Sequence, residues 1–211
     1  MSKSHLNTRG KILDKALEMF NERGIEYVGL RELAGLLDIR VSNITYYFPT
    51  KDDLVYELSL ELSKTNAAII VASEDLTMYF FLEMMHRVYQ NQVQFRCLLL
   101  SFVHVMQQNK RIAEAYKKTQ TVRNATIKTN IDVLTKGGYL QVKDEDEKEF
   151  LVSTLSLISR FWISEAAVSA RPKGTEAQIR YYLLMVTRLL TPYATAKGKR
   201  ELRSFEETLQ G

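Results

Sequence analysis

The chain has 211 residues, of which 45% are hydrophobic and 26% charged, and its net charge is +4. This composition is ordinary for a soluble globular protein, and the length suits one large or two small domains. Three prolines and nine glycines supply few turn residues, which disfavours an all-β fold and predicts an all-α fold. The first ten residues lack the apolar run of a signal peptide, and apolar stretches such as 97–106 are too short to span a bilayer. We therefore expect a cytoplasmic protein that does not associate with membranes.

The first predicted helix covers residues 8–23. Ile12, Ala16 and Phe20 recur four residues apart and form its buried stripe. A second, shorter helix is predicted over residues 30–37, where apolar residues again follow helical spacing. We expect the first helix to support the two short helices that follow it.

Residues 42–48 form the third predicted helix. Ser42 is placed to cap its N-terminus, and Ile44 and Phe48 lie four residues apart on the face that turns inward. The other face is rich in amide, hydroxyl and phenol groups. Two short helices joined by a tight turn at residues 38–41 form a helix-turn-helix, whose second helix can enter a DNA major groove.

The segment after this helix offers a phosphate site. Pro49 ends the helix, Thr50 is placed to cap the next one, and Lys51 opens that helix beside free backbone N–H groups. The first 64 residues carry nine Lys and Arg against ten Asp and Glu, so position rather than total charge must attract DNA.

The polar residues of the helix-turn-helix divide into two kinds of DNA contact. An Asn side chain can bind adenine through two hydrogen bonds, and Thr offers a methyl group to thymine and a hydroxyl group. We interpret Asn43, Thr45 and Tyr46 as base contacts. Arg40, Tyr47 and Lys51 fit phosphate contacts better, and for either tyrosine packing under the turn is an alternative. The predicted DNA-binding residues are Arg40, Ser42, Asn43, Thr45, Tyr46, Tyr47 and Lys51.

A long helix predicted over residues 51–72 joins the N-terminal three-helix domain to a larger C-terminal helical domain. At about 1.5 Å per residue, some twenty residues span about 30 Å, enough to transmit a displacement. Further helices are predicted over residues 75–91, 94–108, 111–134, 144–169 and 175–190. The predicted domains are residues 1–50 for DNA binding, 51–195 for effector binding and dimerisation, and 196–211 as a polar tail.

Two of the last helices are apolar over wide arcs. More apolar surface than one core needs predicts that they pair with a second copy of the chain in a four-helix interface, although both faces could also be internal. The predicted interface residues are Phe150, Leu155, Ile158, Trp162, Tyr182, Val186 and Leu189.

The segment from residue 79 to residue 116 is the predicted effector region. Its aromatic and methionine side chains could line an apolar cavity with sparse polar points, or they could form plain core. The predicted ligand-binding residues are Phe81, Met85, His86, Tyr89, Phe102, His104 and Tyr116.

The N-terminal quarter of the chain resembles the DNA-binding domain of the TetR family of bacterial transcriptional regulators. The residues that carry the resemblance are Thr8, Arg9, Ile12, Leu13, Ala16, Phe20, Gly24, Leu33, Ala34, Asn43, Ile44, Tyr46, Phe48, Lys51 and Leu54. Gly29, Asp38 and Thr45 depart from the family pattern of a capping Thr, a turn Gly and a Tyr that reaches phosphate. Asp38 can still adopt the left-handed turn conformation.

This resemblance implies a homodimer that reads a palindromic operator in double-stranded DNA. It further implies repression that is relieved by a small lipophilic effector, whose identity the sequence does not specify, and movement of the long helix on binding. A DNA-binding helical dimer controlled by a protein partner, with no small-molecule effector, is the alternative, and a helical adaptor that has lost DNA binding is a third possibility.

The sequence does not favour an enzyme. His5, His86 and His104 show no metal-ligand spacing, no glycine-rich phosphate loop is present, and we expect no cofactor and no metal. The single cysteine, Cys97, lies in an apolar run and is expected to be buried as a small hydrophobic residue rather than to act as a redox sensor.

Overall fold

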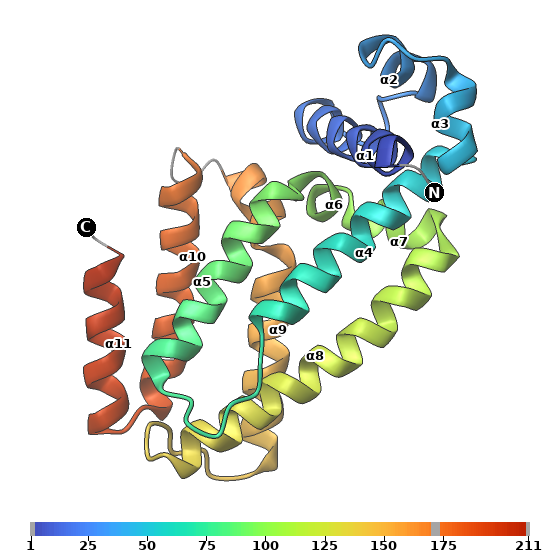
Figure 1. Ribbon diagram of the computed structural model, residues 1–211. Coiled ribbons are helices and arrows are strands. Elements are labelled where there is room, and N and C mark those ends of the chain that lie inside the picture. Colours follow the sequence, from blue (N-terminus) through green and yellow to red (C-terminus); the bar gives the residue numbers. More distant parts are fainter. Residues whose placement is uncertain (1–2, 170–173, 210–211) are drawn as a thin grey trace. The chain divides into compact units, whose positions relative to one another are not determined.

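The computed structural model describes residues 3–169 and 174–209, with side chains from Thr8 onward, as a succession of helices (Figure 1). The helices are α1 (Lys3–Arg23), α2 (Leu30–Leu36), α3 (Val41–Tyr47), α4 (Lys51–Ile69), α5 (Met78–Gln94), α6 (Arg96–Leu100), α7 (Phe102–Gln108), α8 (Lys110–Lys136), α9 (Glu145–Ser169), α10 (Thr175–Leu190), the 3-10 turn η1 (Thr191–Tyr193) and α11 (Ala196–Thr208). Within these ranges there is no β-strand, and the prediction of an all-α fold is confirmed.

The helix bounds differ from the sequence prediction in the segment 94–108, which was expected to be one helix. It forms α6 and α7, which meet at Ser101 with φ −91° and ψ 15°. The Ser101 N–H donates to the Cys97 carbonyl at the end of α6, and the Ser101 carbonyl accepts from the Val105 N–H at the start of α7. Neither Phe95 nor Ser101, which precede α6 and α7, caps its helix with a side-chain hydrogen bond, and no sequence signal marks the break.

The helices form two compact units. The first comprises residues 1–64 and 94–117, and the second comprises residues 65–93 and 118–211. The first unit therefore contains α1–α3, α6 and α7, and also the beginnings of α4 and α8. A segment from the middle of the chain thus belongs to the same unit as the predicted DNA-binding helices.

The first unit is organised around an apolar core that the spacing of its residues predicts. The core side chains, all less than one tenth exposed, are Ile12, Leu13, Ala16, Phe20, Leu33, Ala34, Ile44, Phe48, Leu54, Val55 and Leu58. The turn between α2 and α3 contains Asp38 with φ 51°, so the predicted left-handed conformation at this position is confirmed.

Asn21, near the end of α1, joins α1 to the start of α6 within the first unit. Its carboxamide nitrogen donates to the Gln94 carbonyl at 2.7 Å, and its carboxamide oxygen accepts from the Cys97 N–H at 3.0 Å. The guanidinium of Arg96 donates to the Asn21 carbonyl at 3.0 Å. Asn21 therefore satisfies backbone groups at the otherwise uncapped N-terminus of α6.

The C-terminal segment, which the sequence predicts as a helical or frayed polar tail, contains the helix α11. In the part of 196–211 that the structure describes, α11 buries Leu202 and Phe205 in the second unit. Thr195 caps this helix by accepting from the Gly198 N–H at 3.1 Å. The Glu201 carboxylate accepts from the Tyr79 N–H at the start of α5, at 2.9 Å. The tail thus completes the core of the second unit.

Candidate nucleic-acid interface

The recognition helix of the helix-turn-helix is α3. It begins at Val41 after Arg40, whose backbone is extended, so the prediction that Ser42 caps this helix is wrong. Ser42 instead lies exposed in the first turn together with Asn43. Ile44 is fully buried and anchors the inner face of α3. The helix therefore presents a polar outer surface while its inner face is fixed to the core.

The middle of α3 carries three of the predicted DNA-binding residues. The Thr45 hydroxyl donates to the Ser42 carbonyl at 3.4 Å, which keeps this short side chain close to the helix backbone. Tyr46 is 73% exposed, and its ring meets the Tyr47 ring edge to face with a centroid distance of 4.9 Å. Tyr46 therefore projects furthest from the surface, and Tyr47 supports it from the side.

Lys51 has a structural contact that the sequence did not reveal. Its ammonium group donates to the Ile25 carbonyl at 2.9 Å and to the Glu26 carbonyl at 3.3 Å, in the loop between α1 and α2. An ammonium group carries three N–H donors, so phosphate binding through the third remains a prediction. Lys51 therefore fastens the loop between α1 and α2 in this structure.

An ion pair also joins the two helices that flank this loop, because Arg23 at the end of α1 pairs with Glu32 in α2. Arg23 binds the carboxylate of Glu32 through both terminal nitrogens, and this carboxylate raises the pKa of the guanidinium group. The pair is exposed, so we expect it to orient α2 rather than to add much stability.

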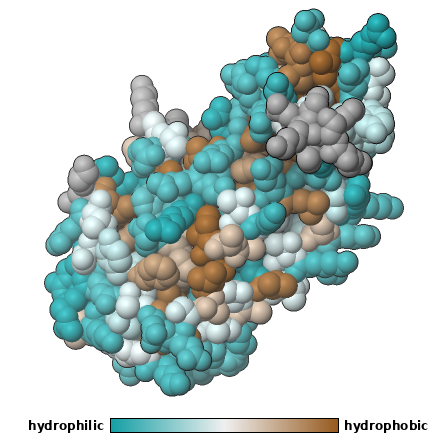
Figure 2. Space-filling model, viewed as in Figure 1, coloured by the Kyte–Doolittle hydropathy of each residue, from teal (hydrophilic) through white to brown (hydrophobic). Residues whose placement is uncertain are grey.

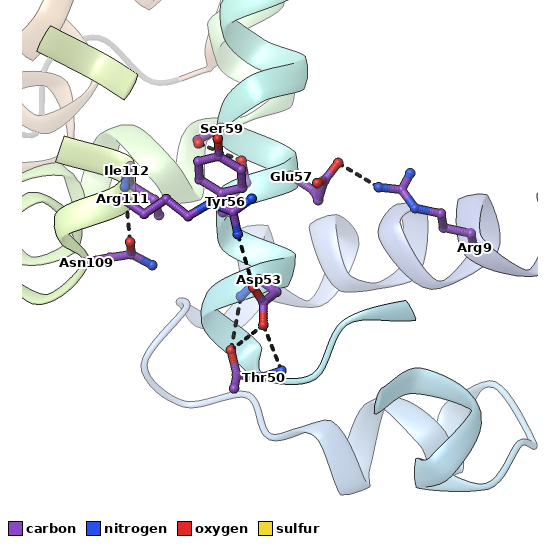
Figure 3. Close-up of polar contacts among 9 residues, drawn as sticks. All are labelled: Arg9, Thr50, Asp53, Tyr56, Glu57, Ser59, Asn109, Arg111 and Ile112. Atoms are coloured by element: carbon purple, nitrogen blue, oxygen red, sulfur yellow. Dashed lines mark hydrogen bonds and ion pairs between the residues drawn. The ribbon is translucent and has the colours of Figure 1, made fainter. Parts of the chain in front are cut away.

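The N-terminus of α4 is fixed by a reciprocal cap (Figure 3). The Thr50 hydroxyl accepts from the Asp53 N–H at 3.3 Å, and the Asp53 carboxylate accepts from the Thr50 N–H at 3.0 Å. The predicted capping role of Thr50 is confirmed. Arg111, at the start of α8, donates to Asp53 at 3.4 Å and lies over the Tyr56 ring at 3.6 Å from its centroid. The helix that follows the recognition helix is therefore held from its first turn.

Arg9 lies inside α1 and is bound within the first unit. It pairs with Glu57 of α4 at 2.6 Å (Figure 3). Its guanidinium carbon also lies 5.1 Å from the centroid of the Phe48 ring. These contacts join α1, α4 and the end of α3.

The predicted effector residues are divided between the two units. Phe81, Met85 and Tyr89 are buried on one face of α5 in the second unit. His86 is half-buried on α5 and lies 3.8 Å from Glu83. The other three, Phe102, His104 and Tyr116, belong to the first unit, where the Phe102 and Tyr116 rings meet edge to face and His104 is exposed.

Apart from Gln92, which is one of the sparse polar points of the predicted effector region, sequence reasoning missed the buried polar side chains of the second unit. They are Asn66, Asn91, Gln92, Asn130, Ser156 and Thr187. A polar residue at an inward position of an amphipathic helix, such as Gln92 one turn after Tyr89, is a signal that could have found them.

Most of the predicted dimer residues are buried or half-buried within the protomer. Leu155, Trp162, Tyr182 and Val186 are buried within the protomer, while Ile158 and Leu189 are half-buried. Phe150 alone of the seven is largely exposed, at 53%. Other exposed apolar side chains on α9 and α10 are Leu157, Val168 and Met185. Figure 2 shows that apolar residues gather in patches on an otherwise mostly hydrophilic surface.

One described helix, α9, is long and apolar enough to cross a membrane by length and composition alone. Its inner face packs in the core of the second unit, and its first turn carries Glu145, Asp146 and Glu147. A core helix with an exposed apolar stripe accounts for this composition.

An inward-anchored short helix with a polar outer face, supported by α1, α2 and the start of α4, defines a helix-turn-helix DNA-binding regulator. Residues 12–58 match the model of the bacterial regulatory proteins of the tetR family, and residues 63–202 match the TetR model described as a bacterial transcriptional repressor. The chain belongs to the TetR family, whose members are transcriptional regulators and not enzymes.

Known proteins agree with this assignment. The probable HTH-type transcriptional regulator YttP of Bacillus subtilis (strain 168) is 29% identical over 86 residues, which cover 36% of this chain and 42% of YttP. A TetR-family regulator from Marinobacter aquaeolei VT8 has a similar fold, with a TM-score of 0.85, 22% identity and 99% of each chain covered. The TetR-family protein CprB from S. coelicolor A3(2) gives a TM-score of 0.71 at 12% identity, with 98% of each chain covered. The chain spans less than half of the length of YttP. The two solved structures have the same fold as this chain.

Proposed function

We propose that this protein is a cytoplasmic transcriptional repressor that binds a palindromic operator as a homodimer and is released by a small molecule. The observation that carries the proposal is the outer surface of α3, where Ser42, Asn43 and Tyr46 are exposed above the buried Ile44. A helix held in this way can place amide and hydroxyl groups against base edges in the major groove.

Dimerisation is supported by the exposed apolar side chains of α9. Phe150, Leu157 and Val168 are separated by seven and eleven residues, so they lie along one side of the helix. Met185 adds an exposed apolar side chain on α10. Contact with the same stripe of a second copy, across a twofold axis, would remove this apolar surface from water. The two recognition helices of the dimer would then read two half-sites.

Release by a small molecule is supported by the core of the second unit. Phe81, Met85 and Tyr89 form a buried apolar face on α5 that suits the body of a lipophilic molecule. The effector must bind the DNA-free form more tightly than the DNA-bound form, because only a difference in affinity shifts the equilibrium. Control by a protein partner is the alternative, and it would leave the DNA-binding properties below unchanged.

The experiment that tests the proposal is selection from a pool of random DNA duplexes by the purified full-length protein at near-physiological salt. We expect a palindrome to be enriched. Retention without sequence preference, or no retention, would contradict the proposed operator binding.

Two variants then separate the roles of the interface residues. We expect Asn43→Ala to relax the base preference at one symmetric pair of positions in the selected palindrome. Arg40→Ala should weaken binding to all sequences and reduce the salt slope by about 1. Equal effects of both variants on every sequence would contradict this assignment of roles.

A further inference from the structure

Hydrogen bonds from buried asparagines on α5 and α8 hold the end of α4 and the residues just after it in the second unit. The Asn91 carboxamide on α5 donates to the Asn66 carboxamide on α4 at 2.8 Å, and both side chains are buried. From α8, the fully buried Asn130 donates through its carboxamide nitrogen to the carbonyl of Val71, just beyond the end of α4, at 3.4 Å. We call Asn66, Asn91 and Asn130 the asparagine cluster.

The cluster leaves one strong acceptor unused. Within the described part of the chain, the carboxamide oxygen of Asn130 is buried and has no hydrogen-bond partner. The nitrogen of this carboxamide faces the Val71 carbonyl, which fixes the orientation of the group, because a carbonyl can only accept. A buried acceptor without a partner has lost its hydration with no hydrogen bond in return, so this oxygen is suited to a donor that arrives from outside the protein.

The fully buried polar side chains of the described residues, to which the cluster belongs, are uncharged. Every polar side chain that is buried among the described residues is an amide or a hydroxyl, and none is Asp, Glu, Lys, Arg or His. A charged ligand would lose its hydration without gaining an opposite charge, which costs far more than the burial of a neutral hydrogen-bonding group. The cluster therefore discriminates against ions.

The next residue of α5 connects the cluster to an aromatic pair. The Gln92 carboxamide accepts from the Trp162 indole at 2.6 Å and donates to the Ser159 carbonyl at 3.0 Å. Tyr89 stacks on Trp162 with a centroid distance of 4.9 Å and an interplanar angle of 15°. Burial raises the pKa of the Tyr89 hydroxyl, which keeps it neutral and able to donate. Trp162 is the single tryptophan of the chain, so its fluorescence reports on this region.

We infer that the effector of this regulator is an uncharged molecule with an N–H or O–H group, which donates to the buried carboxamide oxygen of Asn130. The inference rests on the proposed release by a small molecule and names the chemistry of that molecule. It adds a hydrogen-bonding requirement to the lipophilic body expected from α5.

The position of Asn130 also connects binding to α4. The carboxamide that would accept from the ligand also holds the Val71 carbonyl, so a ligand that reorients it changes a contact at the end of α4. The Asn66–Asn91 bond holds the same turn from α5. Ligand binding and the position of this turn are therefore coupled through one side chain.

The test uses the full-length protein without DNA and four probes with similar carbon chains. These are hexanamide, which is neutral and has N–H donors; 2-hexanone, which only accepts; hexanoate; and hexylammonium. Trp162 fluorescence is recorded as each probe is added. We expect a saturable change with hexanamide, and dissociation constants at least about tenfold higher for the other three, since one hydrogen bond to a buried acceptor is worth about a factor of ten. Equal binding of the four probes, tighter binding of an ion, or no saturable change with hexanamide up to its solubility limit would overturn the inference.

Two matched variants on α8 locate the contact. Asn130→Leu removes the acceptor and should abolish the advantage of hexanamide over 2-hexanone. Asn124→Leu makes the same change at a carboxamide that already accepts from Gln120 and Ser156, and it should keep that advantage. The same advantage in Asn130→Leu as in the unmodified protein would overturn the assignment to Asn130. If Asn130→Leu loses its helical circular dichroism, the comparison of the four probes on the unmodified protein decides whether the inference stands.

The result of the ligand test can be distinguished from the result of the DNA selection that tests the proposed function. Recovery of a palindrome with no preference for hexanamide would remove the inference alone. Preference for hexanamide in a protein that retains no DNA would remove the proposed operator binding and keep the ligand chemistry.

Discussion

Gly198 shows how a single missing side chain fixes the position of a helix. A Cβ atom at this position would lie 2.1 Å from the carbonyl oxygen of Tyr139, a backbone atom that cannot rotate away. The same carbonyl accepts from the Thr195 N–H at 3.0 Å, so movement of either segment would break a hydrogen bond. We expect Gly198→Ala to lower the free energy of unfolding by about 1–3 kcal/mol, measured by urea denaturation.

A matched glycine provides the control for this prediction. Gly35 lies in α2, and a Cβ atom there would meet no atom within 4 Å. Because Ala favours helix over Gly, Gly35→Ala should leave stability unchanged or raise it by about 0.5–1 kcal/mol. Equal destabilisation by both variants, or none by Gly198→Ala, would contradict the close contact with Tyr139.

Cys97 is the second residue whose environment makes a measurable prediction. Burial raises the pKa of its thiol from 9.0 to about 12. The thiolate fraction at pH 8 should then be about a thousandfold smaller than in the unfolded chain, because each pKa unit is a factor of ten. We expect iodoacetamide to react with the native protein far more slowly than with the protein in urea. Equal rates would contradict the buried position.

The raised pKa of Cys97 also determines how this thiol affects stability as the pH changes. A thiol whose pKa is higher in the folded state stabilises the fold while it stays protonated. This contribution is fully present below about pH 9 and is lost as the pH rises toward 12. Cys97→Ala should remove this part of the alkaline loss of stability.

At the scale of elements, α6 depends on a residue that is 75 positions away from it in the chain. Asn21→Ala removes the two side-chain hydrogen bonds to Gln94 and Cys97, and we expect the free energy of unfolding to fall by about 1–2 kcal/mol. The Cys97 amide should also exchange its hydrogen faster, as followed by NMR. Glu22→Ala changes the exposed neighbour on the same helix and should do neither. Unchanged exchange in Asn21→Ala would show that the cap does not hold α6.

The elements also show which parts of the fold were predictable from the sequence. The bounds of α3 and α10 follow from local signals, Pro49 after one and apolar residues at helical spacing in the other. The burial of α11 in the core was not predictable, because Leu202 and Phe205 stand among charged residues, and three apolar residues in thirteen do not stand out without the core that they cover. The cap of α6 by Asn21 is a tertiary contact that local sequence does not encode.

At the scale of the whole molecule, periodicity could not distinguish the core from the dimer face. Trp162 and Tyr182 were chosen because large aromatic residues are frequent at interfaces, yet their rings lie 5.6 Å apart within one protomer. Both faces of α9 are apolar, and only the structure shows which of them the protomer already covers. On α3 the buried Ile44 fixes the inner face, and Ser42, Asn43 and Tyr46 are exposed on the other side, while their contact with DNA stays a prediction.

The proposed dimer gives the prediction at this scale. Leu157 is 55% exposed midway along α9, so Leu157→Glu would place two carboxylates near the twofold axis of an apolar interface. We expect the dissociation constant of the dimer to rise about a hundredfold, which corresponds to about 3 kcal/mol, measured by sedimentation equilibrium. Affinity for a palindromic duplex should fall with it, because a monomer contacts one half-site. Val122→Glu makes a similar change at an exposed apolar residue on α8, 67% exposed, and should leave the dimer intact. If Leu157→Glu remains a dimer while its helical content is unchanged, α9 does not form the interface, and the exposed stripe must be covered in another way.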